Sequence, residues 1–231
     1  MDVRTLKLSE STPKIPSQFP PKLEKLNIFT VHDLLFHKPR KYEDFSKYIK
    51  VSEIPEQPNE STVSLQAKCI KKTIRKIPRR KLWIIEGIFQ DETGITTISW
   101  INQRFRYDQL IENEEYSISG HIKKSGKKAT LTNAEFERSY PGKAPLHTGR
   151  LLPVYPATNG ITPRFFRAYI HKYQNYFSQI SDFIPQQVLD KHHLVGAAEM
   201  LDKIHFPQNH EDIEIGLKRW YFNELFRVNI Y

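Results

Sequence analysis

Cysteine and long apolar runs are the scarcest features of this 231-residue sequence, which contains a single thiol, Cys69. One cysteine excludes an internal disulfide and a multi-cysteine zinc site, and it agrees with a reducing compartment. We expect Cys69 to be an unreactive, buried thiol. No apolar run approaches the roughly 20 residues of a membrane-spanning helix, and Met1 to Gln18 lacks the hydrophobic block of a secretory signal. We therefore expect a globular, cytoplasmic protein with no membrane contact.

Acidic residues number 26 against 35 lysines and arginines, which leaves a formal net charge of +9. A basic balance favours nucleic acid as a partner, ahead of an anionic membrane. No acidic residue occurs between Ser61 and Ile85, and this stretch carries eight positive side chains: Lys68, Lys71, Lys72, Arg75, Lys76, Arg79, Arg80 and Lys81. Such a run is commonly a solvated face, but strand-like segments flank this one, which favours an ordered surface that follows phosphates.

A phosphate loop of the form G-x-x-x-x-G-K-[ST] is absent from the sequence. In the nearest approximation, Gly120, Gly126 and Lys127, the glycines are one residue too far apart, and Lys128 replaces the serine or threonine. The chain therefore has no expected site for ATP hydrolysis. The histidines near the C-terminus lack a cysteine partner or an H-E-x-x-H arrangement, so we expect no metal site, no cofactor site and no catalytic residue.

Composition divides the chain into five parts. Residues 1–18, with serines, threonines and prolines, predict a loosely ordered N-terminus, and 19–61 predict a helical lead-in and linker. In the lead-in, Thr30 is a candidate N-cap and Pro39 ends the helix. Residues 62–140 predict strands, 141–160 an extended connector, and 161–231 a helical segment.

Apolar residues alternate with period two from Thr62 to Arg138. In the first strand the phase slips between Cys69 and Ile70, which predicts a β-bulge. Further strands are expected at 82–90, 95–101 and 116–124 and after the Ser125–Gly126 turn, with a partly helical segment at 102–111. In the fourth strand, Ser117 and Ser119 are expected to point outward.

Five strands with a short helix between the third and fourth is the order of an OB-fold, and a different small barrel or sandwich is the alternative. The expected fold class is α+β: a five-stranded OB-fold β-barrel flanked by an N-terminal helical lead-in and a C-terminal helical segment.

Helices are expected from Thr162–Pro163, from near Pro185, at 197–204 and from Glu211 onward. The last helix carries one apolar stripe: Ile213, Leu217, Trp220, Tyr221, Leu225 and Val228. Because it ends without a capping residue, we expect the chain to be part of a longer protein.

Four segments together carry a family resemblance. They are NIFTVHDLLFHKPRKYED at 27–44, WINQRFRYDQL at 100–110, RLLPVYPATNGIT at 150–162 and MLDKIHFPQNHEDIEIGLKRWYFNEL at 200–225. With these strings the chain resembles the N-terminal wedge region of the RecG family of ATP-dependent DNA helicases. In the first string, Arg40, Tyr42 and Asp44 suit either a structural clasp or a ligand contact, and we expect the string to dock the lead-in against the barrel.

The resemblance implies that the OB-fold wedge grips a branch point and splits the arms, while two RecA-like motor domains hydrolyse ATP. ATP and Mg then belong to the motor domains, which this chain lacks, so it is expected to be inactive alone. The implied partner is branched DNA, such as replication forks and Holliday junctions, in bacterial fork reversal, branch migration, recombination and repair. A monomer is expected. The alternative is a stand-alone OB-fold accessory protein that binds single-stranded DNA or RNA.

The family uses two aromatic residues four positions apart to stack on bases, and these positions map to Ile101 and Phe105. Phe105 matches the pattern, whereas Ile101 keeps only an apolar wedge and loses stacking. By alternation, Trp100 is predicted to lie in the core. Arg104 and Arg106 are the expected phosphate contacts. Further candidates form a basic surface: Lys71, Lys72, Arg75, Lys76, Arg79, Arg80, Lys81, Lys123, Lys124, Lys127 and Lys128.

Overall fold

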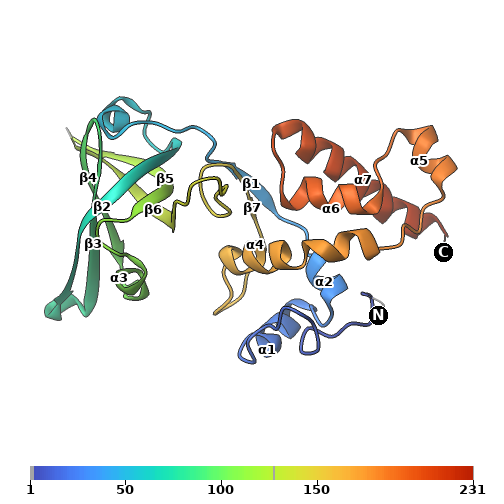
Figure 1. Ribbon diagram of the computed structural model, residues 1–231. Coiled ribbons are helices and arrows are strands. Elements are labelled where there is room, and N and C mark those ends of the chain that lie inside the picture. The colour runs from blue at the N-terminus through green and yellow to red at the C-terminus, as the bar shows by residue number, and fades with distance from the viewer. Residues whose placement is uncertain (1–2, 127, 231) are drawn as a thin grey trace. The chain divides into compact units, whose positions relative to one another are not determined.

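The computed structural model describes residues 3–126 and 128–230, which form two compact units. Residues 44–150 form a sheet unit, and the described residues up to Glu43 and from Leu151 onward form a helical unit. The helical unit therefore combines both ends of the chain, shown in blue and in orange to red in Figure 1.

The sheet unit contains one antiparallel sheet of five strands in the order β4-β3-β2-β5-β6. The strands are β2 (Thr62–Ile77), β3 (Leu82–Asp91), β4 (Gly94–Ile101), β5 (Glu115–Ser125) and β6 (Lys128–Arg138). Helix η2 (Val51–Glu56) precedes β2, η3 (Pro78–Arg80) joins β2 to β3, and α3 (Phe105–Gln109) lies between β4 and β5. The long first strand is central and the helix follows the third strand of the sheet, so the predicted OB-like fold is confirmed.

The edge strands β4 and β6 approach each other without forming a ladder within the described residues. Thr130 Oγ1 of β6 donates to the Thr97 carbonyl of β4 at 3.1 Å, and Trp100 Nε1 donates to the Ala134 carbonyl at 2.7 Å. Because side chains join these edges where backbone pairing would close a barrel, the sheet is OB-like but open, and the expected closed barrel is corrected.

The bulge predicted in the first strand is confirmed, since the β2–β3 register shifts between Cys69 and Lys71. The bend directs the first half of β2 to pair with β5 and the second half to pair with β3. Cys69 is fully buried, as predicted, and its burial raises the pKa of the thiol.

Ser117 and Ser119 are expected to point outward, but the structure buries both side chains. Neighbouring segments of the sheet unit cover this face of β5. Thr148 Oγ1 donates to Ser117 Oγ at 2.8 Å, and the Gly149 amide donates to Ser119 Oγ at 2.9 Å. Serine suits this position because each hydroxyl both donates and accepts.

The helical unit contains α1 (Pro20–Leu23), η1 (Glu24–Leu26), α2 (Val31–Leu35), α4 (Pro163–Lys172), η4 (Gln174–Gln179), α5 (Gln186–His192), α6 (Ala197–His205) and α7 (His210–Ile230). A two-stranded sheet joins β1 (Lys41–Asp44) to β7 (Leu151–Val154). The predicted caps are confirmed: Thr30 forms a capping box with Asp33, and the Thr162 side chain accepts the Phe165 amide. Each helix among residues 3–126 and 128–230 is too short or too polar to cross a membrane.

Two expectations for this unit are corrected. Residues 3–18 bury Leu6, Leu8 and Ile15, which differs from a loosely ordered segment. The predicted stripe of α7 is only partly internal: Ile213 and Trp220 are buried, but Leu225 is 65% exposed. The buried face of α7 instead includes polar residues, because Arg219 and Asn223 have hydrogen-bond partners inside the unit.

Three residues of the string at 27–44 form hydrogen bonds with other parts of the helical unit. The Tyr42 hydroxyl donates to the Ile204 carbonyl of α6 at 2.8 Å, and the Arg40 amide donates to the Val154 carbonyl of β7 at 2.9 Å. His37 Nε2 lies 3.0 Å from the Pro156 carbonyl. These bonds agree with the clasp interpretation, and the segments that they hold lie in the C-terminal part of the chain.

Candidate nucleic-acid interface

The candidate interface begins where β4 ends and α3 begins. Ile101 is the last residue of β4 and is 58% exposed, and Phe105 is the first residue of α3 and is 54% exposed. Trp100, the residue before Ile101 on β4, points the other way and is buried, as alternation predicts. Two large apolar side chains are therefore presented to solvent on either side of a three-residue loop, 102–104.

The hairpin of β2 and β3 extends beside this loop, and Figure 1 shows α3 next to it. Its tip carries Arg79, Arg80 and Lys81, all exposed. Below the tip, Lys76 and Trp83 pair across the strands, and Lys76 Nζ lies 5.7 Å from the centre of the Trp83 ring. The structure thus brings part of the predicted basic cluster to the same region as Ile101 and Phe105.

Trp83 connects the hairpin to the loop and is not among the site residues predicted from the sequence. Arg104 Cζ lies 4.3 Å from the centre of the Trp83 ring, within the range of a cation–π contact. Trp83 shares the inward parity of Ile85 and packs against the edge of the core, where it is only half-buried. Its position next to the tip of a long hairpin was the available signal.

Arg106 is placed differently from the prediction. It is 7% exposed, its Nε donates to Gln103 Oε1 at 2.9 Å, and it forms an ion pair with Glu135 at 3.4 Å. Its Cζ also lies 5.1 Å from the centre of the Phe136 ring. Arg106 therefore holds α3 against β6, because helical periodicity turns it away from its exposed neighbour Phe105.

Lys72 is also engaged in the structure. Its Nζ donates to the carbonyls of Tyr107 in α3, at 2.9 Å, and of the C-cap residue Leu110, at 2.7 Å. A cation at a helix C-terminus satisfies carbonyls that lack partners and complements the helix dipole. Tyr116 holds the same end, since its hydroxyl accepts the Ile111 amide at 2.8 Å, and burial raises the pKa of this phenol.

The remaining predicted lysines and arginines divide into two patches. Lys71 and Arg75 are exposed on β2, where Arg75 pairs with Glu86 at 3.4 Å. Lys123, Lys124 and Lys128 are exposed on the β5–β6 hairpin, and Lys127 lies outside the described residues. The β5–β6 hairpin lies toward the N-terminal end of β2, where Thr62 pairs with His121. The tip of the β2–β3 hairpin, with its arginines, lies at the other end of β2, after the pair Ile77–Leu82. The length of β2 between these ends is roughly 50 Å at about 3.3 Å per residue.

Comparison with known proteins identifies the family. A model described as the RecG wedge domain matches residues 19–176, which is most of the chain. This chain belongs to the RecG wedge domain family. Among curated relatives, an ATP-dependent DNA helicase RecG of Synechocystis sp. is 31% identical over 222 residues, covering 90% of this chain and 26% of the relative. The RecG of Thermotoga maritima is 27% identical over 214 residues, with the same two shares.

A solved structure described as RecG bound to a three-way DNA junction matches with a TM-score of 0.75 and 25% identity, covering 96% of this chain and 30% of that one. The chain thus spans about a quarter of the length of the RecG relatives it matches. The resemblance expected from the four strings is confirmed, and the matched part is the N-terminal wedge region.

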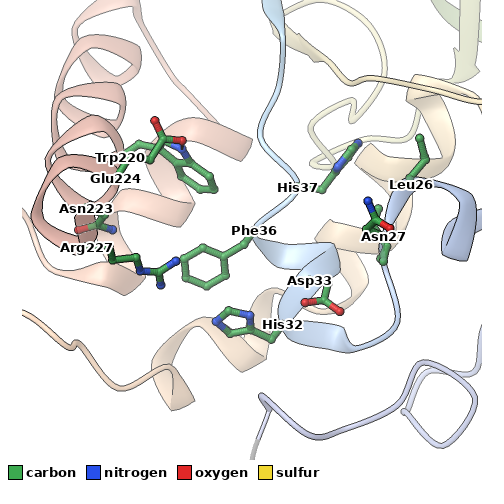
Figure 2. Close-up of a pocket in the computed structure, with 11 residues that line it drawn as sticks. Leu26, Asn27, His32, Asp33, Phe36, His37, Trp220, Asn223, Glu224 and Arg227 are labelled. Carbon is green, nitrogen blue, oxygen red and sulfur yellow. Dashed lines mark hydrogen bonds between the residues drawn. The ribbon is translucent and has the colours of Figure 1, made fainter. Parts of the chain in front are cut away.

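Two of the strings that resemble RecG, at 27–44 and 200–225, line a pocket in the helical unit. Its volume is about 340 Å³, and Figure 2 shows its walls on α2 and α7. The rings of His32 and Phe36 stack at 4.2 Å, and Phe36 lies 5.7 Å from Trp220. In this chain, residues of these two strings pack the lead-in against α7. No group of three possible metal ligands occurs among the described residues.

Proposed function

We propose that this chain is the DNA-binding wedge module of a RecG-like helicase and that its β4–α3 loop separates the arms of branched DNA. The observation that supports this most directly is the pair of exposed apolar side chains, Ile101 and Phe105, beside Arg104 and the basic hairpin tip. An aromatic face stacks on any base, and an aliphatic side chain wedges against a base step.

Arg104, Arg79, Arg80 and Lys81 are the proposed phosphate contacts near the wedge. Contacts to phosphates position a protein on DNA without reading sequence, so binding should be specific for structure and tolerant of sequence. The patch of Lys123, Lys124 and Lys128 is a second proposed contact, for a different arm of the substrate. Arg106 and Lys72 are left out of the proposed contacts because their side chains hold α3.

We propose that the whole protein is an ATP-dependent DNA helicase, which the printed names of its relatives support. We propose that ATP and Mg act in motor domains, in the part of such a protein that this chain does not span. The wedge then converts the movement of DNA by these motor domains into fork reversal and branch migration during DNA recombination and repair. The proposed setting is the bacterial cytoplasm, with the wedge acting as a monomer.

The central test replaces Phe105 by Ala and measures the Kd for a fluorescent three-way junction. Loss of one stacked base should weaken binding by ~1–3 kcal/mol, with little change in melting temperature because the ring is exposed. Ile101→Ala should weaken binding less. Ile95→Ala is its matched control, since Ile95 lies on the same strand with 59% exposure but away from the loop. Unchanged junction affinity in Phe105→Ala would contradict the proposal.

Competition binding separates the wedge from a stand-alone single-strand-binding protein. The wedge should prefer a junction over an equal length of single strand, and the accessory protein should show the reverse preference. Affinity should also fall with salt, with a logarithmic slope of roughly −0.9 per duplex phosphate neutralised. Replacing Arg79 and Arg80 together by Ala should make this slope shallower, and a slope that stays unchanged removes the hairpin tip from the interface.

A further inference from the structure

Asn102 joins the wedge loop to β3 through two hydrogen bonds to one residue. Its backbone amide donates to the Trp83 carbonyl at 2.8 Å, and its side-chain Oδ1 accepts the Trp83 amide at 2.9 Å. The regular β3–β4 pairing has already ended, at Ile84–Ile101. The Asn102 side chain therefore supplies the acceptor that a further strand residue would have provided.

Asn102 also turns the chain from β4 toward α3. Its φ of 58° lies in the left-handed region, which asparagine tolerates better than most residues that have a Cβ. The pairing to Trp83 and the left-handed turn occur at the same residue. Asn102 therefore helps to fix the orientation of Ile101, at the end of β4, relative to Phe105, at the start of α3.

The Trp83 side chain contacts the same loop from the hairpin. Its ring lies 4.3 Å from Arg104 Cζ and 5.7 Å from Lys76 Nζ. A guanidinium over an aromatic face is restricted in orientation while its donors remain open to solvent. Trp83 thus holds Arg104, the residue immediately before Phe105, at the edge of the proposed DNA surface.

Arg106 fixes the loop from the opposite side. Its Nε bond to Gln103 Oε1 at 2.9 Å and its place 5.5 Å from the Phe105 ring connect the loop to the buried side of α3. Asn102, Gln103 and Arg104 are therefore each held by a different contact. A loop ordered in advance binds more tightly than one that must lose its freedom on binding.

From these contacts we propose that Trp83 and Asn102 are positioning residues that hold the wedge loop in its binding orientation. Trp83 acts through Arg104 and Phe105 and needs no contact of its own with DNA. This inference rests on the proposed function of the loop, and it adds two residues to the interface that belong to neither the basic surface nor the pair of apolar wedge residues.

A double-mutant cycle on the 231-residue chain tests the inference, with Kd for a three-way junction measured by fluorescence anisotropy. Trp83→Ala should weaken binding roughly tenfold in the wild-type background and less than about twofold in an Arg104→Ala, Phe105→Ala background, because its effect passes through those two residues. Trp83→Phe, which retains a ring under Arg104, should recover most of the affinity. An equal loss from Trp83→Ala in both backgrounds would overturn the inference.

Hydrogen exchange of the free chain gives a second readout that does not depend on DNA. Trp83→Ala and Asn102→Gly should both speed the exchange of amides in residues 102–106, while the amides of β5 keep their protection. Glycine retains the left-handed turn, so Asn102→Gly isolates the side-chain bond. Unchanged exchange in both variants refutes the positioning role. If Phe105→Ala alone has no effect on junction binding, the proposed function fails, whereas a Phe105 effect without a Trp83 effect overturns only the positioning role.

Discussion

His205 on α6 provides a measurable pH dependence of folding stability. Its imidazole is fully buried, with Nδ1 2.8 Å from the Tyr155 hydroxyl and Nε2 2.7 Å from the Leu35 carbonyl. Because the carbonyl only accepts, Nε2 carries the proton and donates it, and Nδ1 accepts from the tyrosine. The neutral ring is thus fully bonded, and a positive charge at this position would lack solvation.

Burial lowers the pKa of His205 from 6.5 to about 4, although the bond to the Leu35 carbonyl favours the charged form. The unfolded chain therefore binds a proton at a higher pH than the folded chain does. The contribution of His205 to the free energy of unfolding is fully present above 6.5, the pKa in the unfolded chain, and is lost as pH falls from 6.5 toward 4. At about 1.4 kcal/mol per unit of pH, the total loss is about 3 kcal/mol, of which about 2 kcal/mol has occurred by pH 5.

The assay is urea unfolding at several pH values between 7 and 5, followed by far-ultraviolet circular dichroism, which reports mainly on the helical unit. The comparison variant is His205→Gln, because glutamine has a donor and an acceptor for the same two partners but does not titrate. The unfolding free energy of the variant should change by about 2 kcal/mol less than that of the wild type over this range. Parallel curves for the two proteins would refute the reasoning.

Three further predictions concern side chains whose surroundings the structure defines. Arg219→Met should destabilise the helical unit by about 3–5 kcal/mol in urea unfolding, because Arg219 is fully buried and its ion pair with Asp182 at 2.6 Å would be broken; a loss below about 1 kcal/mol contradicts this. Gly149→Ala should lower the free energy of unfolding by about 1–2 kcal/mol, since φ is +65° and a Cβ would meet the Tyr48 hydroxyl. In a Tyr48→Ala background the same substitution should lower it by less, and an equal loss in both backgrounds excludes the clash. Lys72→Met should speed hydrogen exchange in α3 and leave the salt slope of DNA binding unchanged, whereas a shallower slope would make Lys72 a phosphate contact after all.

Features that depend on neighbouring residues in the chain were predicted well. The Thr30 and Thr162 caps, the bulge after Cys69 and the inward side of Trp100 were all correct. Capping, turns and alternation arise from interactions within a few residues, and a local pattern contains that information.

Burial of charged groups could not be read from the same patterns. Arg104 and Arg106 look equivalent in the sequence, yet one is exposed and the other is 7% exposed against Phe136 and Glu135 of β6. Likewise Lys72 reaches carbonyls of α3 that lie more than 30 positions along the chain. Which cations remain available to phosphates depends on which element packs beside each of them.

The sequence by itself determined the family, the succession of strands along the chain and the absence of a phosphate loop, because motifs and periodicity are properties of the chain. Only the tertiary structure decided that both chain ends build one helical unit, that the sheet stays open, and that Trp83 lies beside Arg104. These outcomes depend on contacts between residues distant in sequence, whose partners are chosen by packing and burial of the whole unit.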